Sequence, residues 1–140
     1  MVDEMATLRR LGDSDLTVAN EAEDVRGRKV LDNRGDEAGT VDGILIDEPE
    51  RKVRFLEVGS GGFLGIGKKK VLIPVDAVTR VDDEYVHIDK DREHVVSGPG
   101  YDPELMEEPD NPSYYAGVYG HYGYVPHWGA GYIYPGYPYY

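Results

Sequence analysis

The sequence of 140 residues contains no cysteine. Disulfide bonds, thiolate metal sites and cysteine nucleophiles are therefore excluded. Small secreted domains commonly depend on disulfide bonds, so their absence favours the cytoplasm. No hydrophobic run approaches the ~20 residues that span a bilayer. Residues 1–5 are acidic, and no apolar segment follows them as a secretory signal peptide requires. We expect a cytoplasmic protein without membrane insertion.

Positive charge is also scarce. The chain has 15 basic side chains against 27 acidic ones, a net charge of −12 at pH 7. Nucleic acids and anionic lipid surfaces bind proteins through Lys and Arg, which replace their counterions. The charge balance therefore argues against both as partners. No Lys or Arg follows Arg92, and from Ser113 onward Asp and Glu are absent as well.

Composition divides the chain into four segments. Residues 1–23 are an irregular acidic lead-in, with a short helical turn expected around Thr7–Leu11 that Gly12 and Asp13 would end. Residues 24–97 carry the regular structure. Residues 98–112 form an acidic linker that contains proline, and residues 113–140 form an irregular tail rich in tyrosine, glycine and proline.

Residues 24–97 contain a series of short β-branched and aromatic stretches separated by turns. They predict strands at Lys29–Leu31, Gly39–Asp47, Lys52–Val58, Val71–Val75, Val78–Val81 and Tyr85–Ile88. Pro74 places the fourth of these at an edge or a bulge. No window of 11 residues here sustains helical spacing, so helices should be few. Apolar residues occur on both faces of the third strand, which favours a small coiled barrel with bulges over a flat sheet. The expected core comprises Val30, Val41, Ile44, Phe55, Leu56, Leu72, Ile73, Val86 and Ile88.

Several stretches of the sequence resemble the PRC-barrel family. They are Glu23–Val30 (EDVRGRKV), Gly39–Asp42 (GTVD) and, above all, Val53–Gly67 (VRFLEVGSGGFLGIG) followed by Val71–Val78 (VLIPVDAV). Pro99–Pro103 is similar to the segment that leaves that barrel, so the resemblance covers roughly residues 16 to 105.

The resemblance implies an all-β fold, a six-stranded small β-barrel. The family is named for the cytoplasmic domain of the photosynthetic reaction centre H subunit. It also includes a ribosome maturation factor that binds a ribosomal protein, and many stand-alone bacterial and archaeal proteins. What these members share is protein–protein contact without catalysis. This sequence lacks the transmembrane helix of the H subunit and the N-terminal domain of the maturation factor. The resemblance therefore extends to the barrel domain alone. It implies neither enzymatic activity nor a cofactor, and we expect neither.

A glycine-rich stretch, Gly62–Lys68, matches the core pattern GxxxxGK of a phosphate-binding loop. The full motif requires Ser or Thr after the lysine and a helix behind the loop, whereas Lys69 and a predicted strand follow here. We interpret the stretch as a connection between strands that presents Phe63, Leu64 and Ile66. Lys68–Lys70 is interpreted as a solvated strand edge that discourages edge-to-edge pairing. Its alternative is a contact for an acidic partner or subunit.

No arrangement of residues typical of catalysis or metal binding is recognisable. There are four histidines, His87, His94, His121 and His127; the last two lie six residues apart with no carboxylate between them, and the sequence shows no support for metal ligation by any of the four. The acidic residues lie in turns, where solubility explains them. The sequence therefore predicts no metal site.

The tail is the most unusual segment, with ten tyrosines, six glycines, three prolines and Trp128 in residues 113–140. Its glycines and prolines argue against a long helix, and composition alone is typical of disorder. Tyrosine and tryptophan nevertheless dominate binding surfaces, which favours a tail that docks on protein. Stacking on single-stranded nucleic acid would need a basic groove, and the tail has none.

These features predict a non-catalytic scaffold that self-associates, with the tail docking on its own or a neighbouring barrel. A barrel of about 75 residues buries only ~60% of its unfolded surface, and association is a common remedy. The alternative is a monomeric adaptor for a larger complex, such as the ribosome or a membrane-bound assembly. The predicted contact residues are Phe63, Leu64, Ile66, Tyr114, Tyr115, Tyr119, Tyr122, Tyr124, Trp128, Tyr132, Tyr134 and Tyr137.

Overall fold

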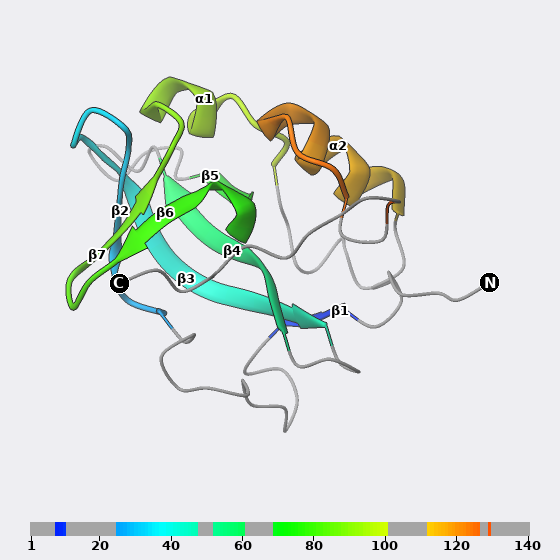
Figure 1. Cartoon of the computed structure of the whole chain (residues 1–140), viewed down its shortest axis with the longest axis horizontal. Coiled ribbons are helices and arrows are strands. Elements are labelled where there is room, and N and C mark those ends of the chain that lie inside the picture. Colours follow the sequence, from blue (N-terminus) through cyan, green and yellow to red (C-terminus); the bar gives the residue numbers. More distant parts are fainter. Residues whose placement is uncertain are drawn as a thin grey trace.

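The computed structural model describes residues 8–10, 25–47, 52–60, 69–100, 112–126 and 129. Within them the chain forms strands and two helices (Figure 1). Their bounds are β1 Leu8–Arg10, β2 Lys29–Leu31, β3 Glu37–Asp47, β4 Lys52–Ser60, β5 Lys69–Pro74, β6 Val78–Val81, β7 Tyr85–Ile88, α1 Arg92–Val96 and α2 Pro112–Tyr122. A 3₁₀ turn, Val75–Ala77, joins β5 to β6.

The six strands predicted between residues 24 and 97 are confirmed. Three of them, β2, β6 and β7, have the predicted bounds, and the other three differ by one or two residues at their ends. Pro74, which lacks a backbone N–H, is the last residue of β5 and pairs with Phe55. Because β5 is the end strand of the sheet order, the predicted edge position of this proline is also confirmed.

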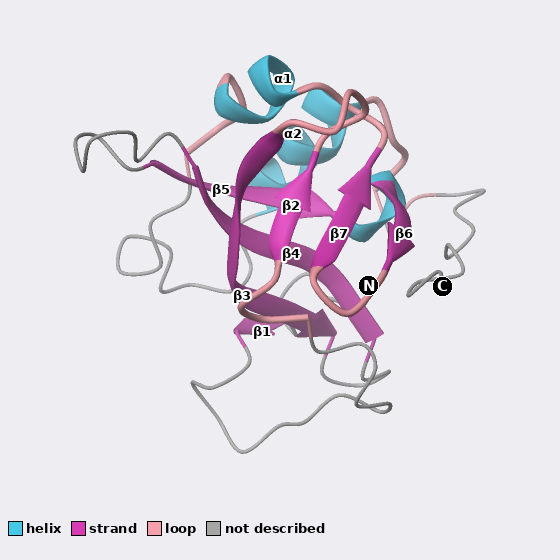
Figure 2. Cartoon of the chain, turned by 90° about the vertical axis from the view of Figure 1, so that its left-hand side faces the viewer, coloured by secondary structure: helices cyan, strands magenta, loops and turns pink. Residues whose placement is uncertain are grey.

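The strands form one mixed sheet in the order β5-β4-β3-β2-β7-β6. All neighbours are antiparallel except β2 and β7, which run parallel. The predicted barrel is not closed, because among the described residues no ladder joins β5 to β6. The chain passes directly from one to the other through the 3₁₀ turn, and the outer side of β5 makes a bridge from Val71 to Gly100 instead. Figures 1 and 2 show the sheet strongly curled, with α1 and α2 at one end.

Bulges explain how such short strands bury both of their faces. The pairing register skips one residue at Ala38 and Asp42 of β3, at Arg54 of β4 and at Thr79 of β6. Each extra residue bends its strand and increases the local twist. All nine predicted core residues are buried, together with every β4 residue from Val53 to Gly59. Of the expected coiled barrel with bulges, the bulges and the burial of both strand faces are therefore confirmed, whereas closure is not.

The lead-in differs from its prediction. Leu8–Arg10 is a strand, not part of a helical turn, and it pairs antiparallel with Leu45–Asp47 of β3. β2 occupies the same edge of β3 only as far as Thr40. The exposed backbone beyond it offers hydrogen bonds to an extended segment, while a helical turn so short has a costly nucleus. Thr7 and Leu11, the ends of the predicted turn, lie outside the described residues.

A buried carboxylate fastens the β2–β3 turn to helix α1. Asp32 Oδ1 accepts the N–H groups of Arg34 and Asp36, both at 2.8 Å, and Oδ2 accepts that of Arg92 at 2.8 Å. Burial by itself would raise the pKa of Asp32, but these three backbone donors favour the charged form and bring the pKa below its ordinary value. One side chain thus joins segments 60 residues apart.

We expect Asp32→Asn to lower the free energy of unfolding at pH 7 by about 2 kcal/mol, because the amide keeps a single acceptor oxygen for three donors. The folded-state pKa lies below the unfolded one, so the stabilisation is complete above pH 3.8 and is lost as the pH falls through the folded-state pKa. Urea unfolding should show a smaller difference in the free energy of unfolding between the wild-type protein and Asp32→Asn at pH 2 than at pH 7. Asp36→Asn, an exposed change in the same turn, should alter stability by less than about 0.5 kcal/mol.

Candidate interaction surface

Part of the tyrosine-rich segment lies in helix α2, Pro112–Tyr122, so the prediction of an irregular tail from Ser113 onward is wrong as far as Tyr122. Proline is tolerated at the start of a helix, where its missing N–H needs no partner. The spacing i, i+3, i+4 and i+7 places Tyr115, Val118, Tyr119 and Tyr122 on one face, and all four are buried. This spacing was visible in the sequence and could have revealed the helix.

Gly123 ends the helix. Its φ of 82° lies in the left-handed region that favours glycine. The N–H of Tyr124 donates to the carbonyl of Tyr119 at 3.0 Å, and the N–H of Gly123 donates to that of Gly120 at 3.2 Å. This is the hydrogen-bond pattern of a Schellman motif. The turn directs the chain from α2 back toward the β7–α1 connection.

The buried face of α2 packs against β4 and β5. The Phe55 ring of β4 stacks on Tyr115 with centroids 5.4 Å apart, and it meets Tyr119 at 5.0 Å with the planes tilted by 50°. Burial raises the pKa of the Tyr115 hydroxyl to about 12 and that of Tyr122 still further. These tyrosines therefore act as core side chains, neutral over the physiological range.

Two histidines join α1 to the C-terminal end of α2. His94 Nε2 donates to the carbonyl of His121 at 2.6 Å, and His121 Nε2 donates to the carbonyl of His94 at 2.7 Å. The two rings lie 4.2 Å apart, and the Tyr122 ring lies beside both at 5.4 and 5.1 Å. Because carbonyls only accept, both histidines carry hydrogen on Nε2. We call this arrangement the histidine clasp.

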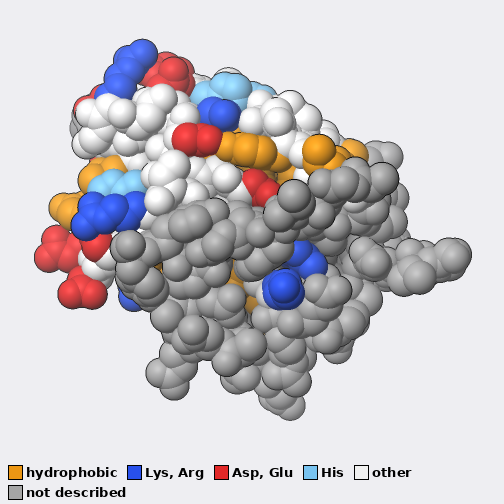
Figure 3. Space-filling model, in the orientation of Figure 1, with side chains coloured by type: hydrophobic (Ala, Val, Ile, Leu, Met, Phe, Trp, Pro, Cys, Tyr) orange, Lys and Arg blue, Asp and Glu red, His pale blue; other side chains and the backbone are white. Residues whose placement is uncertain are grey.

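Tyr124, the residue after Gly123, also contacts the domain. The Tyr124 hydroxyl donates to Asp89 Oδ2, and Lys90 Nζ lies 5.2 Å from the centre of the Tyr124 ring. A cation over an aromatic face is attracted by the ring quadrupole. Residues 115–124 thus follow the domain from β4 to the β7–α1 connection. In Figure 3 hydrophobic and histidine side chains reach the surface over α1 and α2.

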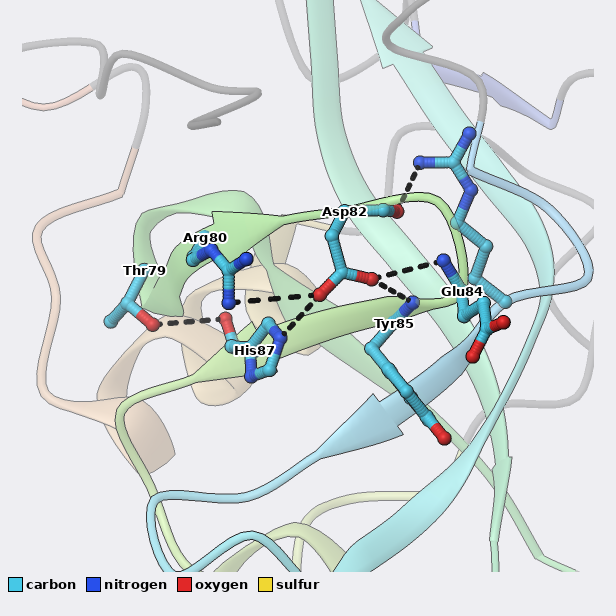
Figure 4. Close-up of polar contacts among 7 residues, drawn as sticks. Thr79, Arg80, Asp82, Glu84, Tyr85 and His87 are labelled. Carbon is cyan, nitrogen blue, oxygen red and sulfur yellow. Dashed lines mark hydrogen bonds and ion pairs between the residues drawn. The ribbon is translucent and has the colours of Figure 1, made fainter.

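A second polar cluster lies at the β6–β7 hairpin (Figure 4). Asp82 Oδ1 accepts the N–H groups of Glu84 and Tyr85 at 2.9 and 2.7 Å. Its Oδ2 lies 3.0 Å from His87 Nε2 and 3.7 Å from Arg80 Nη1. The hydrogen bond from His87, followed by the backbone donors, lowers the pKa of Asp82 to about 2. All these contacts stay within the hairpin, so they stabilise the turn.

The Asp82 carboxyl should titrate with an apparent pKa of about 2 in a ¹³C NMR titration of the native protein. Its contribution to stability is therefore present above the ordinary pKa of 3.8 and is lost as the pH falls through about 2. His87→Gln removes the largest cause of the shift and should raise this pKa. Thr79→Ala, which removes a hydroxyl bonded to the His87 carbonyl, should leave it unchanged. An ordinary pKa in the wild-type protein would contradict the hairpin geometry.

A buried ion pair links β4 to β5. The Glu57 side chain is 0% exposed and its Oε2 lies 3.1 Å from Nζ of Lys70, whose side chain is 39% exposed. Glu57 and Phe55 lie on the same face of β4, because no bulge separates them. Lys70 is thus already engaged in an ion pair within its own domain. Whether the predicted basic run contacts an acidic partner stays a prediction, and Lys68 lies outside the described residues.

The predicted contact residues divide into three groups. Tyr115, Tyr119 and Tyr122 are buried against the domain, and Tyr124 is half-buried on it. Tyr114 lies in α2, but its side chain is not described. Phe63, Leu64, Ile66, Trp128, Tyr132, Tyr134 and Tyr137 lie outside the described residues.

The sequence did not single out Asp32, Phe55 or the histidine clasp as contacts. A local sequence pattern does not predict contacts between residues that lie 27 to 60 positions apart in the chain. Among the described residues, no group of three His, Asp or Glu side chains could hold a metal ion.

The family of the chain follows from comparison with known proteins. The model of the PRC-barrel domain matches residues 18–95, more than half of the chain. The chain belongs to the PRC-barrel family. The PRC-barrel match includes strands β2 to β7 and nearly all of α1, and it ends before α2. A search of curated proteins found no match. The PRC-barrel domain indicates, in general terms, a protein-interaction module. No helix in the described part of the chain has the length and apolar character to cross a membrane.

Proposed function

We propose that the protein is a non-catalytic scaffold whose PRC-barrel domain self-associates, with its aromatic tail as the adhesive segment. The observation that carries the proposal is that the first part of the tail, α2, docks on a PRC-barrel domain, which supports binding of the rest of the tail to the barrel of a neighbouring copy. A segment without Asp, Glu, Lys or Arg follows the family domain, and its tyrosines lie on Phe55 of β4. In a chain of net charge −12 this segment can meet another copy without like-charge repulsion.

The absence of catalysis is part of the proposal. Two carboxylates with several contacts, Asp32 and Asp82, are occupied by hydrogen bonds to the backbone of turns and of α1. The histidine clasp uses both Nε2 atoms on backbone carbonyls. These groups have structural partners, which supports a role in binding.

One observation favours the second candidate, a monomeric adaptor for a larger complex. Tyr115, Tyr119 and Tyr122 are buried on their own domain, so α2 does not offer these rings to a second copy. In that case the partner would bind elsewhere on the barrel or on residues 127–140.

Multi-angle light scattering of the full chain tests the proposal. We expect a defined oligomer at tens of micromolar protein, with a mass at least twice 15.6 kDa. Removing residues 127–140 keeps α2 and Tyr124, and it should return the protein to a folded monomer if the distal tail binds a neighbouring copy. A full chain that stays monomeric at all accessible concentrations contradicts self-association and leaves the adaptor.

A further inference from the structure

Two glycines lie inside α2 at positions where nothing in the described part of the fold requires them. Gly117 and Gly120 are exposed, and a Cβ atom at either would meet no atom within 4 Å. Neither has a positive φ, in contrast to Gly123. A glycine in a helix interior lowers the equilibrium constant for helix formation about fivefold relative to alanine. Together these two weaken α2 about 25-fold without serving close packing or a turn.

The rest of the helix does little to compensate. An isolated helix of 11 residues is marginal in water even with a favourable composition. α2 has no acidic residue in its first turn and no charged side chain for an i, i+4 pair. It therefore exists because its one apolar face, Tyr115, Val118, Tyr119 and Tyr122, packs on the sheet.

In the described part of the chain, α2 is attached to β4, β5, α1 and the β7–α1 connection by side-chain packing and isolated hydrogen bonds, none of which belongs to a sheet ladder. Its rings meet Phe55 of β4, its C-terminal end is held by the histidine clasp, and the next residues reach Asp89 and Lys90. The sheet, in contrast, is bound strand to strand along its whole order, and α2 contributes no strand to it. Loss of α2 would leave every ladder of the sheet intact.

We propose that α2 is a releasable strap, which detaches and unfolds locally while the sheet stays folded and thereby uncovers Phe55. The strap is a conformational device, and it stands whether the protein self-associates or acts as an adaptor. Phe55 would then be exposed only while α2 is detached. The two glycines would raise the equilibrium constant for this local opening.

Native-state hydrogen exchange of the full chain tests the strap. The amides of Val118 to Tyr124 should exchange faster than those of Leu72 and Ile73 in β5, with a weaker dependence on urea, because a local opening exposes less surface than global unfolding. Gly117→Ala with Gly120→Ala should slow exchange in α2 about 25-fold. The matched change Ala116→Gly, also exposed in α2, should speed it about fivefold.

A substitution in the sheet separates local from global opening. Val86 of β7 is fully buried at the far side of the sheet order from β5. Val86→Ala should speed exchange in β5 at least tenfold, and it should leave exchange in α2 unchanged if the strap opens by itself. Equal rates in α2 and β5 in the wild-type protein, both accelerated by Val86→Ala, would overturn the proposal and make α2 an integral part of the folded core.

Discussion

Replacing Phe55 by alanine should lower the free energy of unfolding by about 4 kcal/mol, the typical loss for a buried phenylalanine. The side chain is 0% exposed and lies between the sheet and the rings of Tyr115 and Tyr119. Its removal leaves a cavity and also ends two aromatic contacts. Urea unfolding followed by circular dichroism measures the effect against a total stability that is about 5–15 kcal/mol for a domain.

Phe55→Leu provides the matched control, because it keeps an apolar side chain in β4 and removes only the ring. We expect it to lower stability by about 1.5 kcal/mol. If alanine and leucine have the same small effect, below about 1 kcal/mol, then α2 does not pack on Phe55 in solution.

The second large effect is expected at the ion pair between β4 and β5. Lys70→Met should lower the free energy of unfolding by about 3 kcal/mol, because the fully buried carboxylate of Glu57 then loses its ion pair with the Lys70 ammonium. The methionine keeps most of the apolar stem of the lysine, so lost packing contributes little. The measurement is again urea unfolding at pH 7.

The double substitution Glu57→Gln with Lys70→Met tests the electrostatic origin of the loss. Removing both charges should recover more than half of the deficit, since a buried pair replaced by neutral groups is often close to neutral in stability. A double variant less stable than Lys70→Met alone would show that Glu57 is held mainly by its other contacts.

The strands could be predicted from the sequence because the information that specifies them is local. β6 and β7 are β-branched stretches on either side of Asp82, whose side chain caps the turn between them. Likewise, apolar residues on both faces of β4 indicated that bulges occur, although they did not place the one at Arg54. Burial of the predicted core followed, since each of its members lies in one of these strands.

The open edge of the sheet and helix α2 could not be predicted as readily. Closure requires a ladder between β5 and β6, whereas the outer side of β5 bridges to Gly100, 29 residues after Val71, and no local pattern predicts so distant a contact. In α2 the helical spacing from Tyr115 to Tyr122 was present, but two glycines lowered the intrinsic preference for a helix. Tertiary packing on Phe55 outweighed that preference.

The parallel pairing of β2 with β7 has a consequence for how the chain folds. Lys29 meets Tyr85 in this ladder, and the hydrogen bonds Arg28–Asp82, Asn33–Asp89 and Arg92–Asp32 span 54, 56 and 60 residues. The entropy of closing that long loop must be overcome before any of these contacts forms. During synthesis β2 can therefore pair with β7 only after the ribosome has released Tyr85 and the residues that follow it, and a shorter nascent chain lacks the β2–β7 ladder. Folding is expected in the slow, millisecond-to-second range of non-local β topologies.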